Sequence, residues 1–301
     1  MSTVEIAGRH LRLSNLDKVL YPAAGFTKAQ VVDYYARIGP AMLPHLADRA
    51  VTMVRWPNGV EAERFFEKRC PPHAPEWVRS AAYGDPDDPI VGCVVDELAT
   101  LVWMANLAAL ELHTLQARVS SQGRPDSMVF DLDPGPGADI LDCARVGIEL
   151  RELLDELGLQ TVAKTSGSKG LHLAVPLHTK VTDDDTKRFA RALGQLLATR
   201  NPKRVTVIMR REERRGKVFV DWSQNDRSKT TVCAYSLRGN TRPTVSTPIT
   251  WDEASDAIAA HDARALSFET EDAIDRVEHL GDLYAANLSV EQTLPALPSA
   301  R

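Results

Sequence analysis

The chain has 301 residues, of which 44% are hydrophobic and 26% are charged, a composition typical of a globular protein with a large buried core. The formal net charge is −5, so any nucleic-acid partner must be held by local basic clusters rather than by an overall positive field. The sequence has no apolar leader and no run of 18 apolar residues, so we expect a cytoplasmic protein without a membrane segment.

The cysteines are few, and they lie far apart at Cys70, Cys93, Cys143 and Cys233. They form no Cys-x-x-Cys pair, a usage typical of proteins from a reducing cytoplasm. Cys70 and His73 have a spacing that zinc ligands use, but no second pair completes a set of four ligands. We therefore do not expect a structural zinc ion.

The N-terminal segment predicts an edge strand at residues 4–13 and then a helix that begins at Lys28, with Thr27 as its N-cap. Lys18 then lies on a loop and Lys28 in the first helical turn, where the helix dipole favours an anion. A bound phosphate would reconcile these charges. Two solvated lysines remain the competing interpretation.

Two strands joined by a tight turn are expected next, at Val51–Trp56 and Arg64–Lys68. Phe65 and Phe66 are neighbours in the second strand, so they point to opposite faces and one is expected to be exposed. An exposed aromatic ring beside basic residues suits stacking on a nucleic-acid base. Packing of that ring under a loop is an equally good interpretation.

The segment before the centre of the chain combines an acidic loop with an apolar run. Tyr83–Pro89 is rich in turn residues and is expected to be a loop between strands. Asp96–Leu115 is strongly apolar and predicts a single helix. His113 would lie near its end, in a position where histidine is more often a capping or core group than a ligand.

The stretch Met128–Gly135 predicts a buried strand that ends in a turn at Pro134 and Gly135. Side chains alternate along a strand, so Asp131 and Asp133 point to the same side. Two adjacent carboxylates repel each other unless a cation lies between them, and a hard divalent ion such as Mg²⁺ or Mn²⁺ accepts such ligands. A solvated turn is the alternative.

Two helices are predicted in the second half, at Ile140–Leu157 and Asp184–Thr199, and two strands between them flank the loop 165–170, Thr-Ser-Gly-Ser-Lys-Gly. The small residues of this loop let backbone N–H groups approach an anion, and Lys169 adds a positive charge. The loop is not a P-loop, because the spacing and the following helix are absent. His172 is expected on the face opposite its leucine neighbours.

The last third of the chain predicts a charged hairpin loop at Arg210–Lys217, for which a solvated turn and a phosphate contact are equally good interpretations. The strand that follows ends at Asp221, a third carboxylate at a strand terminus. Helices are expected from Trp251 onward, and residues 286–301 are expected to form a flexible tail. Strands and helices alternate with hairpins between them, which favours the α+β class.

Carboxylates at strand ends, an anion-binding loop and basic clusters are the parts needed for nucleotidyl transfer, and metal-assisted phosphodiester hydrolysis needs nearly the same parts. Four segments together resemble the primase-polymerase domain of bacterial ligase D, a member of the archaeo-eukaryotic primase superfamily. They are Asp-Leu-Asp-Pro-Gly at 131–135, Thr-Ser-Gly-Ser-Lys-Gly-Leu-His at 165–172, Val-Phe-Val-Asp-Trp-Ser-Gln-Asn at 218–225 and Tyr-Ser-Leu-Arg-Gly at 235–239. The resemblance runs from about residue 10 to about residue 285 and implies one catalytic domain over residues 1–301, in a stand-alone form without ligase or nuclease domains.

The resemblance implies an α+β fold with mixed and antiparallel sheets flanked by helices and an RRM-like catalytic module. It implies a template-directed polymerase that fills short gaps in DNA, prefers ribonucleotides and uses a two-metal site with Mn²⁺ or Mg²⁺, in end joining or gap repair. The implied partners are gapped or broken 5′-phosphorylated DNA, NTPs and dNTPs, a separate ATP-dependent DNA ligase and an end-binding protein, at the nucleoid in the cytoplasm. A metal-dependent nuclease and a non-catalytic binder of phosphorylated DNA ends are the alternatives.

The resemblance also assigns roles to individual residues. The catalytic metal ligands are Asp131, Asp133 and Asp221. The groups that hold the incoming nucleotide are His113, Ser166, Lys169, His172, Gln224 and Arg238. The pocket for the downstream 5′-phosphate contains Asn15, Lys18 and Lys28, and the aromatic residues near the templating base are Phe65 and Phe66.

Two departures from the family pattern stand out in this chain. Val54 occupies a position that often carries a basic residue, so one contact to the triphosphate is expected to be missing. The acidic loop Tyr83–Pro89 is short, whereas in end-joining relatives the matching loop helps to bridge two broken ends. Both departures favour gap filling over the bridging of ends.

Overall fold

The computed structural model describes residues 2–296, and the chain folds into two compact units. Unit 1 contains Met1–Ser120, Thr230–Thr247 and Phe268–Asp282. Unit 2 contains Ser121–Lys229, Pro248–Ser267 and Leu283–Arg301. Each unit is therefore built from three separate stretches of the sequence. The single catalytic domain that the resemblance implies stays a prediction.

Unit 1 is built around a six-stranded sheet with the order β15-β9-β5-β8-β7, in which β6 also pairs with β5. Helix α1 packs against helices α2 and α6, and a Cβ added to Gly39 of α1 would lie 2.4 Å from Leu98 Cδ1, which shows how closely α1 and α2 approach. The elements of this unit are β1 (Ser2–Ile6), β2 (Arg9–Leu13), β3 (Val19–Tyr21), β4 (Phe26–Thr27), α1 (Lys28–Leu46), β5 (Ala50–Arg55), β6 (Phe65–Glu67), β7 (Ser80–Asp85), β8 (Asp88–Val94), α2 (Leu98–Asn106), β9 (Ala109–Thr114), β15 (Thr231–Val232) and α6 (Thr270–Leu280).

The predicted start of α1 is confirmed. The Thr27 side chain accepts a hydrogen bond from the Gln30 backbone N–H, and the Gln30 side chain accepts one from the Thr27 N–H, which forms a capping box. Two buried tyrosines then anchor the helix to the rest of unit 1. Tyr35 donates its hydroxyl to the Leu110 carbonyl at 2.6 Å, and Tyr34 donates to the Tyr235 carbonyl at 2.7 Å.

The single helix predicted for Asp96–Leu115 is wrong. Helix α2 ends at Asn106, and the chain turns at Ala108, whose φ of +57° lies in the left-handed region. Strand β9 follows and pairs with both β5 and β15, so His113 lies on a strand rather than near a helix end. Hydrogen bonding to these two neighbouring strands outweighs the helical propensity of an apolar run.

The acidic segment Tyr83–Pro89 is not an open loop. It belongs to the hairpin of β7 and β8, in which Asp85 pairs with Asp88 across a two-residue turn. The same region holds a disulfide between Cys70 and Cys93, a pair that the wide spacing of the cysteines in the sequence did not predict. The two cysteines are 23 residues apart in the sequence. They meet because the backbone N–H of Cys70 donates to the carbonyl of Val91, which lies in β8 with Cys93.

Unit 2 contains a six-stranded sheet with the order β13-β14-β10-β12-β11-β16, in which β13 and β14 pair in parallel and the other neighbours are antiparallel. Its elements are β10 (Ser127–Pro134), α3 (Ile140–Glu156), β11 (Val162–Thr165), β12 (Leu171–Pro176), α4 (Asp183–Arg200), β13 (Val205–Thr206), β14 (Val218–Asp221), β16 (Pro248–Ile249) and α5 (Trp251–Ala260). Along the chain, the core elements are β10, α3, β11, β12, α4 and β14. If its four strands are numbered 1 to 4 in chain order, they lie in the sheet in the order 4-1-3-2. This split β-α-β arrangement confirms both the α+β class and the RRM-like module.

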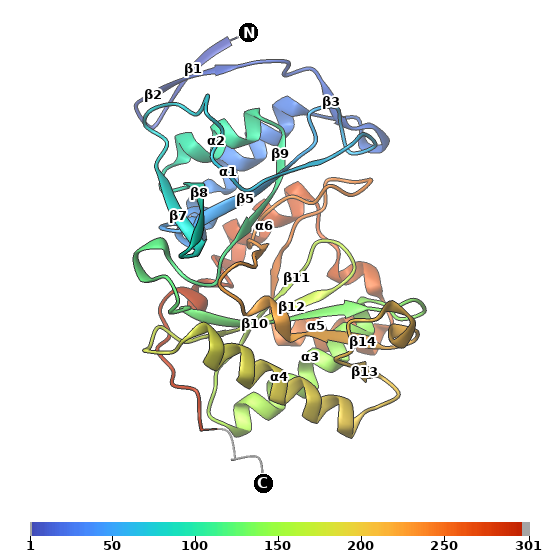
Figure 1. Ribbon diagram of the computed structural model, residues 1–301. Helices are drawn as coiled ribbons and strands as arrows, with labels where there is room; N and C mark the ends of the chain where they lie inside the picture. The colour runs from blue at the N-terminus through green and yellow to red at the C-terminus, as the bar shows by residue number, and fades with distance from the viewer. Residues whose placement is uncertain (1, 297–301) are drawn as a thin grey trace. The chain divides into compact units, whose positions relative to one another are not determined.

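Helices α3 and α4 cover one face of the unit 2 sheet, as Figure 1 shows. Glycines allow this close packing, because a Cβ on Gly147 of α3 would lie 2.8 Å from the Leu171 side chain, and one on Gly194 of α4 would lie 3.4 Å from the Val220 side chain. Leu132 pairs in register with both Leu171 and Val220, so these fully buried side chains share the face under the helices. Each contributes about 2 kcal/mol of burial free energy.

The C-terminal segment of unit 2 is hydrogen-bonded as far as it is described. The Gln292 side chain donates to the Pro176 carbonyl at 2.7 Å and accepts from the Gln160 backbone N–H at 2.6 Å. Residues 297–301 of the predicted tail lie outside the described residues. Within residues 2–296, no helix combines the length and the apolar character needed to cross a membrane.

Asn225 completes the edge of strand β10 where its neighbour stops. Strand β14 pairs with Asp131 through Pro134 only, so Val129 lies beyond its end. The Asn225 side chain takes over both bonds there: its Oδ1 accepts from the Val129 N–H at 2.8 Å, and its Nδ2 donates to the Val129 carbonyl at 2.7 Å. Asn225 is 1% exposed, so water cannot replace it.

We expect Asn225→Ala to lower the free energy of unfolding by about 3 kcal/mol, because it leaves two buried backbone groups of Val129 unsatisfied. Urea denaturation followed by circular dichroism measures this change. Asn201→Ala is the matched control, since that side chain bonds the Glu149 carboxylate near the surface and its loss should cost less than about 1 kcal/mol. Equal losses in the two variants would contradict the role given to Asn225.

Candidate functional site

The three acids singled out from the sequence lie on one face of the unit 2 sheet. Asp131 of β10 pairs in register with Asp221 of β14, which places their Cα atoms about 5 Å apart. Asp133 lies two residues after Asp131 and points to the same side. Helices α3 and α4 cover the opposite face, so the acids are half-buried on the side that these helices leave open. The predicted grouping of carboxylates is therefore present in unit 2.

Hydrogen bonds fix the position of Asp221. Its Oδ1 accepts from the backbone N–H of Ser223 at 2.9 Å and from the Ser223 hydroxyl at 2.6 Å. Lys229 in turn donates to the Ser223 hydroxyl at 2.6 Å. The carboxylate is therefore oriented by the short 3-10 helix Trp222–Gln224 that follows β14, before any ligand arrives.

Gln224 lies between two of the acids. Its side-chain nitrogen is 3.0 Å from Asp221 Oδ2 and 3.5 Å from Asp131 Oδ2, so an uncharged donor bridges the carboxylates. In the described part of the chain, no three His, Cys, Asp or Glu side chains converge as a ready set of metal ligands. The donor chemistry still fits Mg²⁺ or Mn²⁺, because these ions accept carboxylate oxygens. Asp131 and Asp221 would hold such an ion if the Gln224 amide turned aside.

His172 continues the row of polar residues across the sheet. It pairs in register with Asp131 on one side and with Lys164 on the other. Its Nε2 lies 3.2 Å from Asp131 Oδ1, and its Nδ1 lies 3.2 Å from Lys164 Nζ. Because an ammonium group only donates, Nδ1 of His172 accepts and Nε2 carries the proton that points at Asp131. His172 thus links a buried lysine to an acid.

The loop 165–170 is held closed by its own serine. The Ser166 hydroxyl accepts from the backbone N–H groups of Ser168, at 3.2 Å, and Gly170, at 3.0 Å. Gly170 is required here, because a Cβ would lie 2.3 Å from the Leu132 carbonyl oxygen. Two of the N–H groups expected to meet an anion are therefore already engaged, whereas Lys169 is exposed and lines a cavity of about 620 Å³ with Ser168 and residues 134–140.

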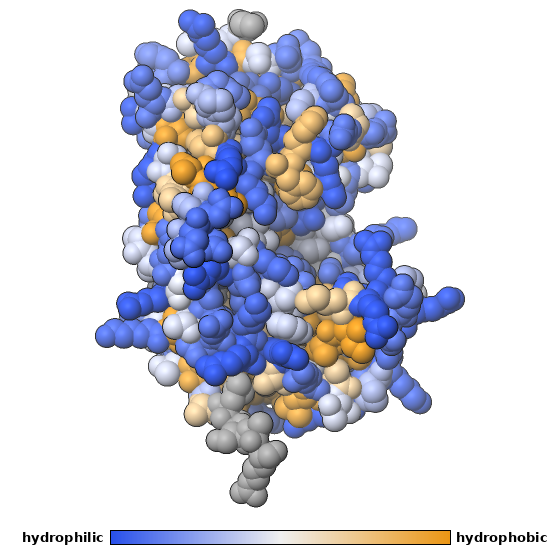
Figure 2. Space-filling model, viewed as in Figure 1, coloured by the Kyte–Doolittle hydropathy of each residue, from blue (hydrophilic) through white to orange (hydrophobic). Residues whose placement is uncertain are grey.

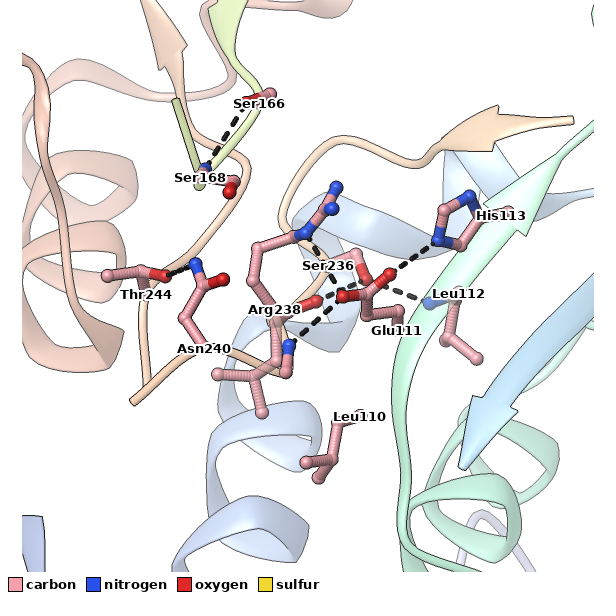
Figure 3. Close-up of polar contacts among 12 residues, drawn as sticks. Leu110, Glu111, Leu112, His113, Ser166, Ser168, Ser236, Arg238, Asn240 and Thr244 are labelled. Carbon is pink, nitrogen blue, oxygen red and sulfur yellow. Dashed lines mark hydrogen bonds and ion pairs between the residues drawn. The ribbon is translucent and has the colours of Figure 1, made fainter. Parts of the chain in front are cut away.

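Unit 1 holds His113 and Arg238 around a buried acid, Glu111 (Figure 3). Glu111 Oε2 lies 2.8 Å from His113 Nε2, and Oε1 lies 3.2 Å from Arg238 Nε. Burial raises the pKa of Glu111, but the hydrogen bond from His113 and the positive charges of Arg238 and His113 outweigh it and lower this pKa to about 2. Glu111 is therefore ionised at neutral pH.

Asn15, Lys18 and Lys28 also meet in unit 1, at the start of helix α1. Asn15 adopts a φ of +53°, and its carbonyl accepts from the Lys18 N–H at 3.1 Å, which forms the turn that carries Lys18. Lys28 is 6% exposed, and its Nζ donates to the Ser14 carbonyl at 2.7 Å. Burial, Lys18 and Arg55 together lower the pKa of Lys28 to about 8. A crowded set of cations of this kind suits an anion.

Phe65 and Phe66 are both exposed, by 50% and 60% respectively, so the exposed aromatic ring expected from the sequence is present twice. They lie on β6, a short strand that pairs with β5 alone, and their side chains point to opposite faces that are both open at these positions. The Arg64 guanidinium lies 5.1 Å from the Phe66 ring centroid. Most of the surface in Figure 2 is hydrophilic with small hydrophobic groups between, and an exposed pair of phenylalanines is unusual on such a surface.

The predicted site residues divide between the two units. Unit 2 carries the three acids together with Ser166, Lys169, His172 and Gln224, and unit 1 carries Asn15, Lys18, Lys28, Phe65, Phe66, His113 and Arg238. Sequence reasoning missed Glu111 and Lys164. Each is a charged residue in an otherwise apolar strand, and this isolated charge was the available signal. Glu111 lies two residues before His113, and Lys164 pairs in register with His172. Val54 is fully buried and pairs with Glu111 and Phe66.

Known proteins resemble this chain over most of its length. A family model for the primase-polymerase domain of LigD matches residues 27–284. The chain is 44% identical over 277 residues to the multifunctional non-homologous end joining protein LigD of Mycolicibacterium smegmatis, covering 91% of this chain and 36% of that protein. It is 33% identical over 272 residues to the bifunctional LigD of Bacillus subtilis, covering 90% of this chain and 43% of that protein. The chain thus spans less than half the length of these relatives.

A solved structure resembles it as well. The polymerase domain from Mycobacterium tuberculosis Ligase D in complex with DNA matches with a TM-score of 0.86 and 41% sequence identity. The match covers 92% of this chain and 98% of that chain.

The lowered pKa of Lys28 predicts a stability that depends on pH. Between pH 8 and 10.5, the unfolded chain keeps a proton that folded Lys28 has released, so the free energy of unfolding should rise with pH across this window relative to Lys28→Met. Below pH 8 both states are protonated, and this group adds no dependence. Urea denaturation at several pH values measures the difference. Lys203→Met, at an exposed lysine, should follow the wild type. Parallel curves for Lys28→Met and wild type would contradict the shift.

Proposed function

This chain belongs to the LigD primase-polymerase domain family, and on that premise we propose that it fills short gaps in DNA by template-directed addition of nucleotides, with ribonucleotides preferred. The family makes it a DNA-directed nucleotidyltransferase that depends on divalent metal ions. The proposed substrates are gapped DNA with a downstream 5′-phosphate and NTPs, and the proposed setting is the repair of broken or gapped DNA. A ligase would then seal the product.

One observation carries this proposal: the register of β10 and β14 that aligns Asp131, Asp133 and Asp221 on the face away from α3 and α4. Bound Mn²⁺ or Mg²⁺ would supply activation of the primer 3′-hydroxyl and neutralisation of the leaving pyrophosphate. The chain's own part is to orient these carboxylates. Ser223 holds Asp221, and the Nε2 proton of His172 points at Asp131, so the acids need little reorganisation when the substrate binds.

Recognition of the incoming nucleotide is proposed for basic and polar groups, in each unit by itself. Lys169 and Ser166 in unit 2, and His113 and Arg238 in unit 1, are donors that suit phosphate oxygens by charge-assisted hydrogen bonds. Gln224 already touches two of the acids, so we assign it a place beside the nucleotide and the metal ions. Val54 is buried and uncharged, so this chain has one basic contact to the triphosphate fewer than the family pattern provides.

Recognition of the DNA is proposed for unit 1. Asn15, Lys18 and Lys28 form a cluster at the start of α1, in which Lys28 is nearly buried and loses solvation that a bound phosphate would compensate. Phe65 and Phe66 offer exposed rings on which a templating base can stack. This division of labour would let one unit read the gap while the other performs the chemistry.

Primer extension tests the reaction. A primer on DNA with a short gap and a downstream 5′-phosphate should be extended by templated ribonucleotides in Mn²⁺ or Mg²⁺, and less well by deoxyribonucleotides. Asp131→Ala combined with Asp133→Ala should abolish extension, because two metal ligands are lost, and leave binding to the gapped DNA largely intact. Extension by this double variant would overturn the metal assignment. Shortening of the primer without added nucleotide would instead indicate a nuclease, and binding without either reaction a non-catalytic DNA-end binder.

The lysine cluster has its own test. Lys18→Ala and Lys28→Ala should each weaken binding of 5′-phosphorylated gapped DNA by about 10- to 100-fold, because each removes a charge-assisted hydrogen bond. The matched control is the same duplex with a 5′-hydroxyl, for which the loss should be small. Fluorescence anisotropy at fixed salt measures both affinities. Equal losses on the two duplexes would remove the 5′-phosphate from this cluster.

A further inference from the structure

Glu111 is a buried carboxylate for which the family motifs give no role. It lies in the middle of β9, between Leu110 and Leu112, and is 6% exposed. Two groups hydrogen-bond to it, His113 Nε2 at 2.8 Å and the Gly239 backbone N–H at 3.0 Å, and Arg238 Nε forms an ion pair with it at 3.2 Å (Figure 3). A buried charge with this many partners is costly to assemble, so its presence between His113 and Arg238 requires a reason.

We propose that Glu111 is a positioning residue, which holds the His113 imidazole and the Arg238 guanidinium in one fixed arrangement that receives the triphosphate of the incoming nucleotide. This inference rests on the proposed function, in which those two side chains bind the triphosphate. Glu111 itself would not touch the nucleotide. It would act through the two residues that it holds.

The strand geometry explains how one carboxylate reaches both side chains. Glu111 and His113 are two residues apart on β9, so they point to the same side of the strand. Strand β15 pairs with β9 through Val232 and His113, and the chain beyond β15 then returns to bring Arg238 against Glu111. The Ser236 hydroxyl accepts from the Leu112 N–H at 2.9 Å, which ties this returning segment to the same strand.

The backbone at Arg238 and Gly239 is fixed from both sides. Tyr21 donates its hydroxyl to the Arg238 carbonyl at 2.8 Å. Gly239 lies directly against the Trp56 ring, because a Cβ at this position would lie 2.1 Å from Trp56 Cζ2. The absence of a side chain therefore lets the Gly239 N–H reach the carboxylate. Such a fixed backbone leaves the Arg238 side chain as the part that Glu111 must orient.

The direction of the contacts suits a phosphate ligand. The Glu111 carboxylate contacts the Nε of Arg238, and the two terminal nitrogens of the guanidinium point away from the carboxylate (Figure 3). Those two nitrogens are the pair that forms parallel hydrogen bonds to phosphate oxygens. The carboxylate also holds the imidazole and the guanidinium in place before the nucleotide binds. Less reorganisation is then left for the binding step.

Glu111→Gln tests the role, because the amide keeps the size of the side chain and an acceptor for Gly239 but loses the charge. We expect the KM for the incoming ribonucleotide to rise about 10- to 100-fold in primer extension, with kcat close to the wild-type value and an unchanged melting temperature. The matched control is Glu271→Gln, at an exposed acid of unit 1 that pairs with Arg37 at 3.0 Å. It should leave both KM and kcat unchanged.

A double-variant cycle sharpens the test. If Glu111 acts through Arg238, Glu111→Gln should raise KM much less in an Arg238→Ala background than in the wild type. Full additivity would overturn the inference, as would a KM for Glu111→Gln equal to that of the control. A fall in melting temperature with KM and kcat both impaired would also overturn it and make Glu111 a support of the fold. Failure of the wild type to extend any primer is a different result, since it would overturn the proposed function itself.

Discussion

The alternation of side chains along β10 is the constraint on which the candidate site depends. Odd-numbered positions of this strand carry the acids Asp131 and Asp133, and even-numbered positions carry the apolar side chains that pack under α3 and α4. A shift of one residue in the pairing would exchange the two faces and bury the carboxylates beneath the helices. Asn225 and the paired strands β12 and β14 prevent that shift, so the register that builds the core also sets the chemistry.

Buried charge is handled in the same way in each unit. In unit 2 the nearly buried Lys164 contacts His172, which contacts Asp131; in unit 1 Glu111 lies between His113 and Arg238. In both clusters each ionised group faces a polar partner, which offsets the desolvation cost that an isolated ion would carry. The clusters are therefore rigid as well as polar, a property that suits the binding of a highly charged ligand.

Local patterns in the sequence predicted the features that depend on neighbouring residues alone. The capped helices that begin at Lys28 and Ile140, the strand with Asp131 and Asp133, and the α+β class follow from periodicity and capping residues. The segment Asp96–Leu115 could not be divided correctly, because an apolar run fits a helix and a buried strand equally well. Glu111, Lys164 and the disulfide depend on which strands become neighbours, and no short stretch of sequence contains that information.

The interleaving of the two units has a consequence for synthesis on the ribosome. Strands β10 to β14 of unit 2 lie within one continuous stretch, Ser121–Lys229, whereas unit 1 begins earlier but needs Phe268–Asp282 to supply α6. The acid-bearing core can therefore form while the first 120 residues still wait for their last helix, although Pro248–Ser267 joins unit 2 only later. Truncation before residue 268 removes a piece of the unit that was begun first.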